Sequence, residues 1–304
     1  MLTTNKIVLD KANKKHYAVG AFNTNNLEIT QALVNAATLE KSPIIIQTSE
    51  GAISYAGMLQ LRNMVYTAAA NTKVPITLHL DHGRDISLIK KCILCGWTSV
   101  MYDGSHLPLD QNIKNTAMIV KFAHSHGVSV EGELGTIGGA EENIVARNII
   151  YTDPDIAVEF VKKTKVDSLA IAIGTSHGAY KFKGKSSLNF KILKEIKSRL
   201  KMPLVLHGAS SIPQDIVKKA NMYGAKLESA HGVSESNIRH AVKLGINKVN
   251  IDSDTRMAFN AALRETLAKN PKEFDPRKIL TPCRDLITLQ TRKKMRILGS
   301  SGKV

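Results

Sequence analysis

The sequence predicts an α/β fold, a single-domain (β/α)8 barrel. Eight short runs of apolar and β-branched residues recur along the 304 residues, and their starts lie 24 to 45 residues apart. Each gap has room for one helix, and several gaps carry apolar residues at helical spacing. Apolar strands that alternate with helices are typical of a parallel sheet covered on both faces. Eight such units favour a closed barrel over an open sheet.

The predicted strands cover residues 18–22, 43–48, 75–80, 99–102, 129–134, 169–173, 203–206 and 248–251. The predicted helices cover residues 26–40, 86–95, 112–123, 154–161, 187–200 and 214–223. An open dinucleotide-binding sheet is the alternative, but no Gly-x-Gly-x-x-Gly follows the first strand. We therefore expect one domain over residues 1–304, with a C-terminal helical extension at about 255–304.

Composition narrows the class of protein. Lys and Arg number 42 against 26 Asp and Glu, so the net charge is +16, and 43% apolar residues exclude a fully disordered chain. The lysines are spread out with few aromatic residues between them. This favours a solvated surface that attracts a phosphorylated substrate, with no nucleic acid partner. The sequence contains no apolar run of about 18 residues, so it predicts no membrane span. Three cysteines and no secretory signal favour a cytoplasmic location.

Polar residues end each predicted strand. Asn23 and Ser49 follow the first two strands, and further Asp, Glu, His and Ser residues end the other six. In this type of barrel the loops after the strands build the active site at one face. We therefore count Asn23 and Ser49 among the candidate substrate contacts.

Three histidines occupy corresponding strand ends, and each is followed by glycine: His82, His177 and His207. Imidazoles from three strands can bind one zinc ion and leave a coordination position open for substrate. Taken singly, each histidine could equally be a hydrogen-bonded loop residue. The trio favours metal binding.

Acidic residues accompany the histidines. Asp81 could move a proton on a metal-bound substrate or hold His82 in place. Neighbouring residues of a regular strand point to opposite faces, so Asp81 and His82 can share one site only if the chain bends there. Asp103 and Glu133 could bind a second cation or orient the histidines.

The loops after the sixth, seventh and eighth strands supply groups that suit a phosphate. Their backbone N–H groups and small hydroxyls come from Gly178, Gly208-Ala209-Ser210 and Asn250-Ile251-Asp252-Ser253. Lys181 could add a charged contact. The glycine-rich, acidic stretch 135–143 is either a lid that delivers a carboxylate or an ordinary surface loop.

These residues lie in segments that resemble the class II, metal-dependent fructose-1,6-bisphosphate aldolases and the related tagatose-bisphosphate aldolases. The matching segments are GAFN (20–23), QTSEGA (47–52), HLDHG (79–83), TSVMYDGSH (98–106), VEGELG (130–135), GTSHG (174–178), LHGAS (206–210) and KVNID (248–252). The resemblance therefore extends over nearly the whole chain.

The resemblance implies a barrel that forms a homodimer or homotetramer. It implies a catalytic zinc ion on His82, His177 and His207, with Asp81 as the proton donor. Asp103 and Glu133 match positions for a second divalent metal. Asn250 would hold the enediolate. Glu141 would be the lid base, although the neighbouring Glu142 leaves the choice between them open.

The resemblance also implies how the substrate is held. The phosphate of dihydroxyacetone phosphate would contact Gly178, Lys181, Gly208, Ala209, Ser210, Asp252 and Ser253, helped by Na⁺ or K⁺. Ile251 lies in the same segment. Arg256 would reach the distal phosphate of a neighbouring subunit's substrate.

The implied activity is reversible zinc-dependent aldol cleavage of fructose 1,6-bisphosphate, a step of glycolysis and gluconeogenesis. Tagatose 1,6-bisphosphate, which differs in configuration at C4, is the alternative substrate. A zinc hydrolase on the same barrel is a remoter alternative. Such an enzyme would have no phosphate cradle and would usually carry an early His-x-His pair, and this sequence has no such early pair. A nucleic-acid-binding protein would carry a recognisable module, and none is found.

Overall fold

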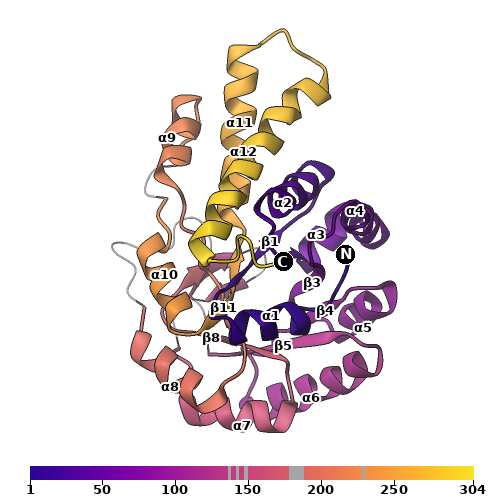
Figure 1. Ribbon diagram of the computed structural model, residues 1–304, viewed down its shortest axis with the longest axis vertical. Coiled ribbons are helices and arrows are strands. Elements are labelled where there is room, and N and C mark those ends of the chain that lie inside the picture. The colour runs from indigo at the N-terminus through magenta and orange to yellow at the C-terminus, as the bar shows by residue number, and fades with distance from the viewer. Residues whose placement is uncertain (136–137, 142–143, 147–149, 178–187, 228–229) are drawn as a thin grey trace.

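The computed structural model describes residues 1–135, 138–141, 144–146, 150–177, 188–227 and 230–304. Eight parallel strands close into a barrel (Figure 1). Their order around it is β1 (Val19–Asn23), β11 (Ile246–Ile251), β10 (Leu204–Leu206), β8 (Ser168–Ile171), β5 (Ser129–Leu134), β4 (Ser99–Tyr102), β3 (Ile76–Gly83) and β2 (Ile44–Thr48). Each predicted strand overlaps one of them, and the predicted fold class is confirmed.

The barrel strands are apolar because both of their faces are covered. Every residue of β2, β4, β5, β8, β10 and β11 is buried. One face packs on the surrounding helices and the other fills the barrel interior, so apolar residues occupy both alternating sets of positions. Buried charged residues of β5 and β11, namely Glu131, Glu133 and Lys248, depart from this pattern.

Helices surround the strands (Figure 1). They are α2 (Leu27–Glu40), α3 (Glu50–Ala56), α4 (Met58–Ala70), α5 (Ile86–Cys95), α6 (Leu109–Ser125), α7 (Pro154–Thr164), α8 (Phe190–Leu200), α9 (Gln214–Met222) and α10 (Glu235–Lys243), with α1 (Asn5–Lys14) before the first strand. A capping side chain stands before many of them. Asn26 accepts a hydrogen bond from the N–H of Ile29, and Asp153, just before Pro154, accepts from the N–H groups of Asp155 and Ile156. Helices α1, α3, α4 and α10 were not among the predicted elements.

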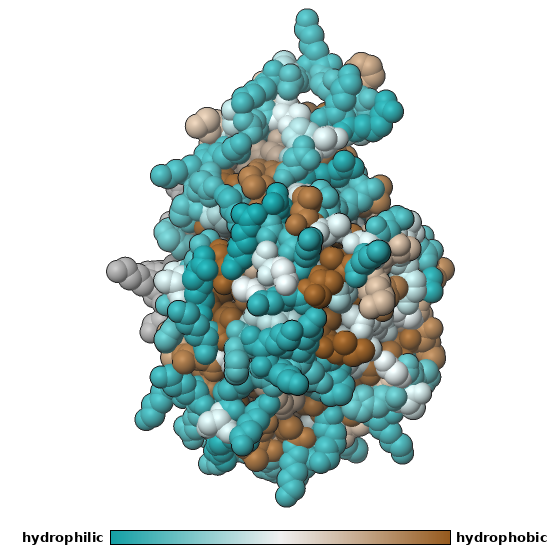
Figure 2. All heavy atoms as spheres, viewed as in Figure 1, coloured by the Kyte–Doolittle hydropathy of each residue, from teal (hydrophilic) through white to brown (hydrophobic). Residues whose placement is uncertain are grey.

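The last two helices, α11 (Ser253–Lys269) and α12 (Pro276–Leu298), form a hairpin that extends beyond the barrel (Figure 1). Helix α12 packs along α11 and α2, and α11 also packs against α9. Hydrophilic side chains dominate the face shown in Figure 2, and they cover most of this hairpin. This agrees with the high net charge of the chain.

A small second sheet joins β7 (Ile144–Ala146), β6 (Gly138–Glu141) and β9 (Ser176–His177). Strand β6 pairs with β9 so that Gly139 lies opposite His177. The stretch expected to be a loop therefore contains a strand that pairs beside one of the three predicted zinc histidines. None of the helices among the described residues has the length and apolar character needed to cross a bilayer.

Candidate active site

The chain bends at the end of β3. His82 has φ +48°, a left-handed backbone conformation that is uncommon for a residue with a side chain. The pairing of β3 with β4 shifts register between Leu80 and Gly83. This bend lets Asp81 and His82 face one site: an atom from each, together with one from His207, all lie within 4.8 Å of one another.

His207 lies just after β10 and is fully buried. Its Nδ1 atom lies 2.8 Å from Nε2 of His82, and the two rings are nearly perpendicular, at 82°. The main chain of the third histidine, His177, lies close by. A Cβ added to Gly208 would lie 2.6 Å from the carbonyl oxygen of Ser176, and Gly208 has φ +59°. Glycine is therefore required after His207, where the backbone meets β9.

Two carboxylates lie on the other side of the His82 ring. Its Nδ1 atom is 3.3 Å from Asp103 Oδ2 and 3.8 Å from Glu133 Oε2. The Nη2 atom of Arg84 also donates a hydrogen bond to Asp103 Oδ2, at 3.0 Å. Burial disfavours a charged imidazole, but the carboxylates of Asp81, Asp103 and Glu133 outweigh it and raise the pKa of His82 to about 10. This corner of the site therefore favours positive charge.

Glu133 is buried, and its Oε2 atom accepts no hydrogen bond from the described residues. Burial, followed by the charge of Asp103, raises its pKa well above the usual range. On the opposite side of the ring, His82 Nε2 and His207 Nδ1 converge, and imidazole is a good ligand for zinc. The buried, unpartnered oxygen of Glu133, on the Nδ1 side, suits a second divalent cation. The residues present thus fit the metal that the sequence predicts.

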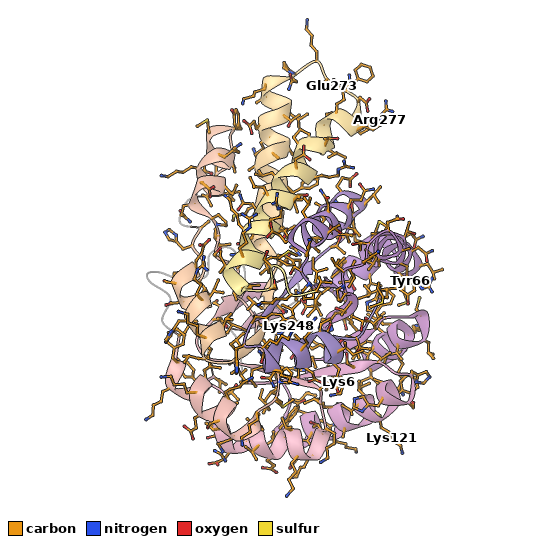
Figure 3. The ribbon with its side chains drawn as sticks, viewed as in Figure 1. Lys6, Tyr66, Lys121, Lys248, Glu273 and Arg277 are labelled. Atoms are coloured by element: carbon orange, nitrogen blue, oxygen red, sulfur yellow. The ribbon has the colours of Figure 1, made fainter. Side chains whose placement is uncertain are left out.

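A buried ion pair lies behind His207. The Nε2–H of His207 donates to Glu131 Oε1 at 2.8 Å, and Lys248 Nζ donates to Glu131 Oε2 at 2.7 Å. The Glu131 and Lys248 side chains have no exposed surface, and Lys248 lies among the strands in Figure 3. Because Nε2 carries the proton, the Nδ1 lone pair of His207 is left facing His82.

Three side-chain amides hold the carboxylate of Asp81. Gln47 and Asn23 donate to Oδ2 at 3.0 and 3.2 Å, and Asn250 donates to Oδ1 at 3.0 Å. The amide nitrogen of Asn250 is also 3.3 Å from His207 Nδ1. The predicted residues Asn23, Asp81 and Asn250 thus come together from strands β1, β3 and β11.

The sequence analysis assigned no role to Gln47, Glu131 or Lys248. A usable signal existed for two of them, since Glu131 and Lys248 are charged residues inside strands that are buried along their whole length. Such residues are expensive to bury unless they are paired. Nothing in the local pattern around Gln47 points to Asp81.

The predicted phosphate segments also meet. Ser210 Oγ accepts a hydrogen bond from the N–H of Asp252 at 3.2 Å, which joins the loop after β10 to the start of α11. Arg256 forms contacts of 2.8 Å with both carboxylate oxygens of Asp252. Ser49 caps α3 by accepting from the N–H of Ala52.

Three of the sequence-predicted residues lie outside the described residues: Gly178, Lys181 and Glu142. Glu141 is the last residue of β6. Its role as the lid base stays a prediction.

Comparisons with known proteins identify relatives of the whole chain. The family model "Fructose-bisphosphate aldolase class-II" matches residues 3–303. Fructose-bisphosphate aldolase of Thermus caldophilus is 45% identical and covers 100% of both chains. Fructose-bisphosphate aldolase of Giardia intestinalis is 45% identical and covers 99% of this chain and 94% of its own.

Solved structures agree as well. The YdjI aldolase from Escherichia coli K12 is 31% identical with a TM-score of 0.80, covering 100% of this chain and 99% of its own. A putative fructose-1,6-bisphosphate aldolase from Coccidioides immitis is 26% identical with a TM-score of 0.82, covering 99% and 98%.

Proposed function

The chain belongs to the class II fructose-bisphosphate aldolase family, a family of lyases, and from that premise we propose how its site cleaves fructose 1,6-bisphosphate. Cleavage breaks the C3–C4 bond of the open-chain sugar. The products are dihydroxyacetone phosphate and glyceraldehyde 3-phosphate, and the reverse reaction condenses them. This is a step of glycolysis.

The proposed cofactor is a zinc ion held by His82, His177 and His207. The observation that carries this proposal is the 2.8 Å separation between His82 Nε2 and His207 Nδ1. When bound, zinc supplies a Lewis acid that polarises the substrate carbonyl. Glu131 supports the site by accepting a hydrogen bond from the Nε2–H of His207, which leaves Nδ1 available as a ligand.

Asp81 moves the proton at the C4 oxygen. In cleavage the proton leaves the C4 hydroxyl, and in condensation Asp81 returns it to the aldehyde oxygen. The three amides around its carboxylate fix the direction in which its oxygens point. Asn250 also donates toward the oxygen on which negative charge develops, because its amide nitrogen lies between Asp81 and His207.

The phosphate of the triose half binds the loop after β10 and the start of α11, through Gly208, Ala209, Ser210, Asp252 and Ser253. Support comes from the hydrogen bond that joins Ser210 to Asp252. Gly178, Lys181 and a Na⁺ or K⁺ ion complete this phosphate site in the proposal. Glu141 removes the proton from bound dihydroxyacetone phosphate. Arg256 serves the distal phosphate in a neighbouring subunit.

Asp103 and Glu133 have two proposed uses. They would hold a second divalent cation through their carboxylate oxygens, because one oxygen of each residue lies within 4.8 Å of the other. Without that cation they orient the His82 ring. We also propose that the enzyme acts in the cytoplasm as a homodimer or homotetramer.

The deciding experiment combines metal removal with substrate comparison. Purified protein is stripped with a zinc chelator, assayed, and titrated with Zn²⁺, and cleavage of fructose and tagatose bisphosphates is measured side by side. We expect activity to vanish and to return at about one zinc per chain, with fructose bisphosphate preferred. Full activity after chelation, or a lysine adduct trapped by borohydride, would refute the zinc mechanism. Preference for the tagatose sugar would reassign the substrate.

A further inference from the structure

We propose that Asp254 and Lys294, on the two C-terminal helices, are positioning residues that hold the loop 208–212 in the shape that binds phosphate. The inference rests on the proposed function, because it takes residues 208–210 to be part of the phosphate site. The sequence alone assigned no role to Asp254 or Lys294. Neither belongs to the metal site or to the amides around Asp81.

Asp254 lies in the first turn of α11 and binds the end of the loop. Its Oδ1 atom accepts the N–H of Ile212 at 2.7 Å, and its Oδ2 atom accepts the N–H of Ser211 at 3.2 Å. The hydroxyl of Ser211 is 3.3 Å from the same Oδ2 atom. One carboxylate therefore holds two consecutive backbone N–H groups of the loop.

Lys294 comes from α12 and completes the cluster. Its Nζ atom lies 3.0 Å from Asp254 Oδ2 and donates to Ser211 Oγ at 2.5 Å. Both charged side chains are only 5% exposed. Burial opposes the charged form of Asp254, but Lys294 and the loop N–H groups outweigh it and lower the pKa of the carboxyl. The carboxylate stays charged at neutral pH.

The loop needs this support because its backbone is strained at the far end. Ile212 has φ +52°, which is a genuine outlier for a β-branched side chain, whereas the φ of +59° at Gly208 is one that glycine adopts without strain. The side chain of Ile212 packs in a buried cluster with Ile216 and Met257, which anchors the far end. Such conformations persist only where the surroundings impose them, and the Asp254 carboxylate supplies that constraint through the N–H of Ile212.

We call Asp254 and Lys294 the clamp. The clamp and the proposed phosphate-binding residues both involve the start of α11. Ser210 Oγ accepts a hydrogen bond from the N–H of Asp252, two residues before Asp254. The start of α11, from its N-cap to its first turn, therefore holds the loop at Ser210, Ser211 and Ile212. Backbone N–H groups that are held in place before the ligand arrives bind it with less loss of entropy. Loosening the clamp should weaken phosphate binding and leave the metal histidines in place.

The chain supplies a matched control for the test. Lys293 is the next residue on α12, its side chain is half exposed, and its nearest acid is Asp215 at 3.9 Å. Lys293→Met removes the same charge from the same helix turn without touching the clamp. Lys294→Arg retains a cation at the clamp and serves as the conservative variant.

The experiment measures KM and kcat for fructose 1,6-bisphosphate, the inhibition constant of inorganic phosphate, and zinc content. For Lys294→Met we expect KM and the phosphate inhibition constant to rise together by about tenfold. We expect kcat to stay within about twofold and zinc to stay at the wild-type level. Lys294→Arg should recover most of the loss, and Lys293→Met should match wild type.

Unchanged KM and phosphate inhibition in Lys294→Met would overturn the inference, and so would an equal loss in Lys293→Met. If Lys294→Met fails to fold, Asp254→Asn tests the same point, because it keeps the size of the side chain and removes its charge. Absence of aldol cleavage in the wild-type protein would instead refute the proposed function. The two failures are thus distinguishable.

Discussion

The Nε2 atom of His82 lies 2.8 Å from the Nδ1 atom of His207, although 125 residues separate them in the chain. Two imidazole lone pairs at this distance repel each other unless a proton or a metal cation lies between them. The remaining nitrogen of each ring faces acids, Asp103 on His82 and Glu131 on His207. This arrangement orients both rings toward one shared point.

His207→Ala should therefore abolish zinc binding. We expect zinc content, measured by elemental analysis, to fall below about a tenth of the wild-type level, and cleavage to fall with it. The control is His126→Ala, because His126 is an exposed histidine on the surface. Retention of one zinc per chain in His207→Ala would remove it from the ligand set.

Asp81→Ala should separate catalysis from metal binding. Loss of a positioned acid typically costs 10²–10⁴-fold in rate, so we expect kcat to fall by roughly that factor. Zinc content should stay unchanged, since the histidines keep their own partners Asp103 and Glu131. A near-normal rate in this variant would show that another group moves the proton.

The Glu131–Lys248 pair permits a test that separates stability from metal affinity. Glu131→Gln alone leaves the buried Lys248 charge uncompensated and should cost roughly 3–5 kcal/mol of unfolding free energy. Adding Lys248→Met removes that charge, so the double variant should recover most of the stability. It should still bind zinc about 10–100-fold more weakly, because His207 has lost its anionic partner.

Thermal unfolding of the zinc-free proteins and competition with a chromogenic chelator give the two readouts for these variants. Wild-type zinc affinity in the double variant would show that Glu131 serves only the fold.

The contacts of Glu40 predict that the stability of the fold depends on pH. Hydrogen bonds from Arg296, opposed by burial and reinforced by Ser301 and Arg292, lower its pKa from 4.5 to about 2. A carboxyl with a lowered folded-state pKa stabilises the protein above its unfolded pKa. That contribution is lost as pH falls toward the folded pKa. The stability that Glu40 provides should therefore disappear between about pH 5 and pH 2.

Glu40→Gln is the matching variant, because it removes the charge and keeps the shape. Its melting temperature should lie below that of the wild type at pH 7, and the two should converge as the pH approaches 2. A constant difference across this range would show that the contact of Glu40 with α12 does not depend on charge.

Local pattern was enough to predict the barrel and several residues that the structure brings together in the candidate site. Apolar runs at strand length predicted the eight barrel strands, because burial on both faces favours apolar residues. The polar strand ends pointed to His82, His207 and Asp103, since the carboxyl ends of parallel strands meet at one face. Histidine followed by glycine marked two places where the backbone turns tightly.

Only the tertiary structure decided how these groups meet. The left-handed backbone at His82 turns Asp81 and His82 toward one site. The residue type at position 82 does not predict that conformation. Glu131 meets Lys248 across 117 residues, and Lys294 meets Ser211 across 83. Sequence periodicity records which face of an element is buried. It does not record which distant side chain completes a hydrogen bond there, because that depends on how the closed barrel and its C-terminal helices pack.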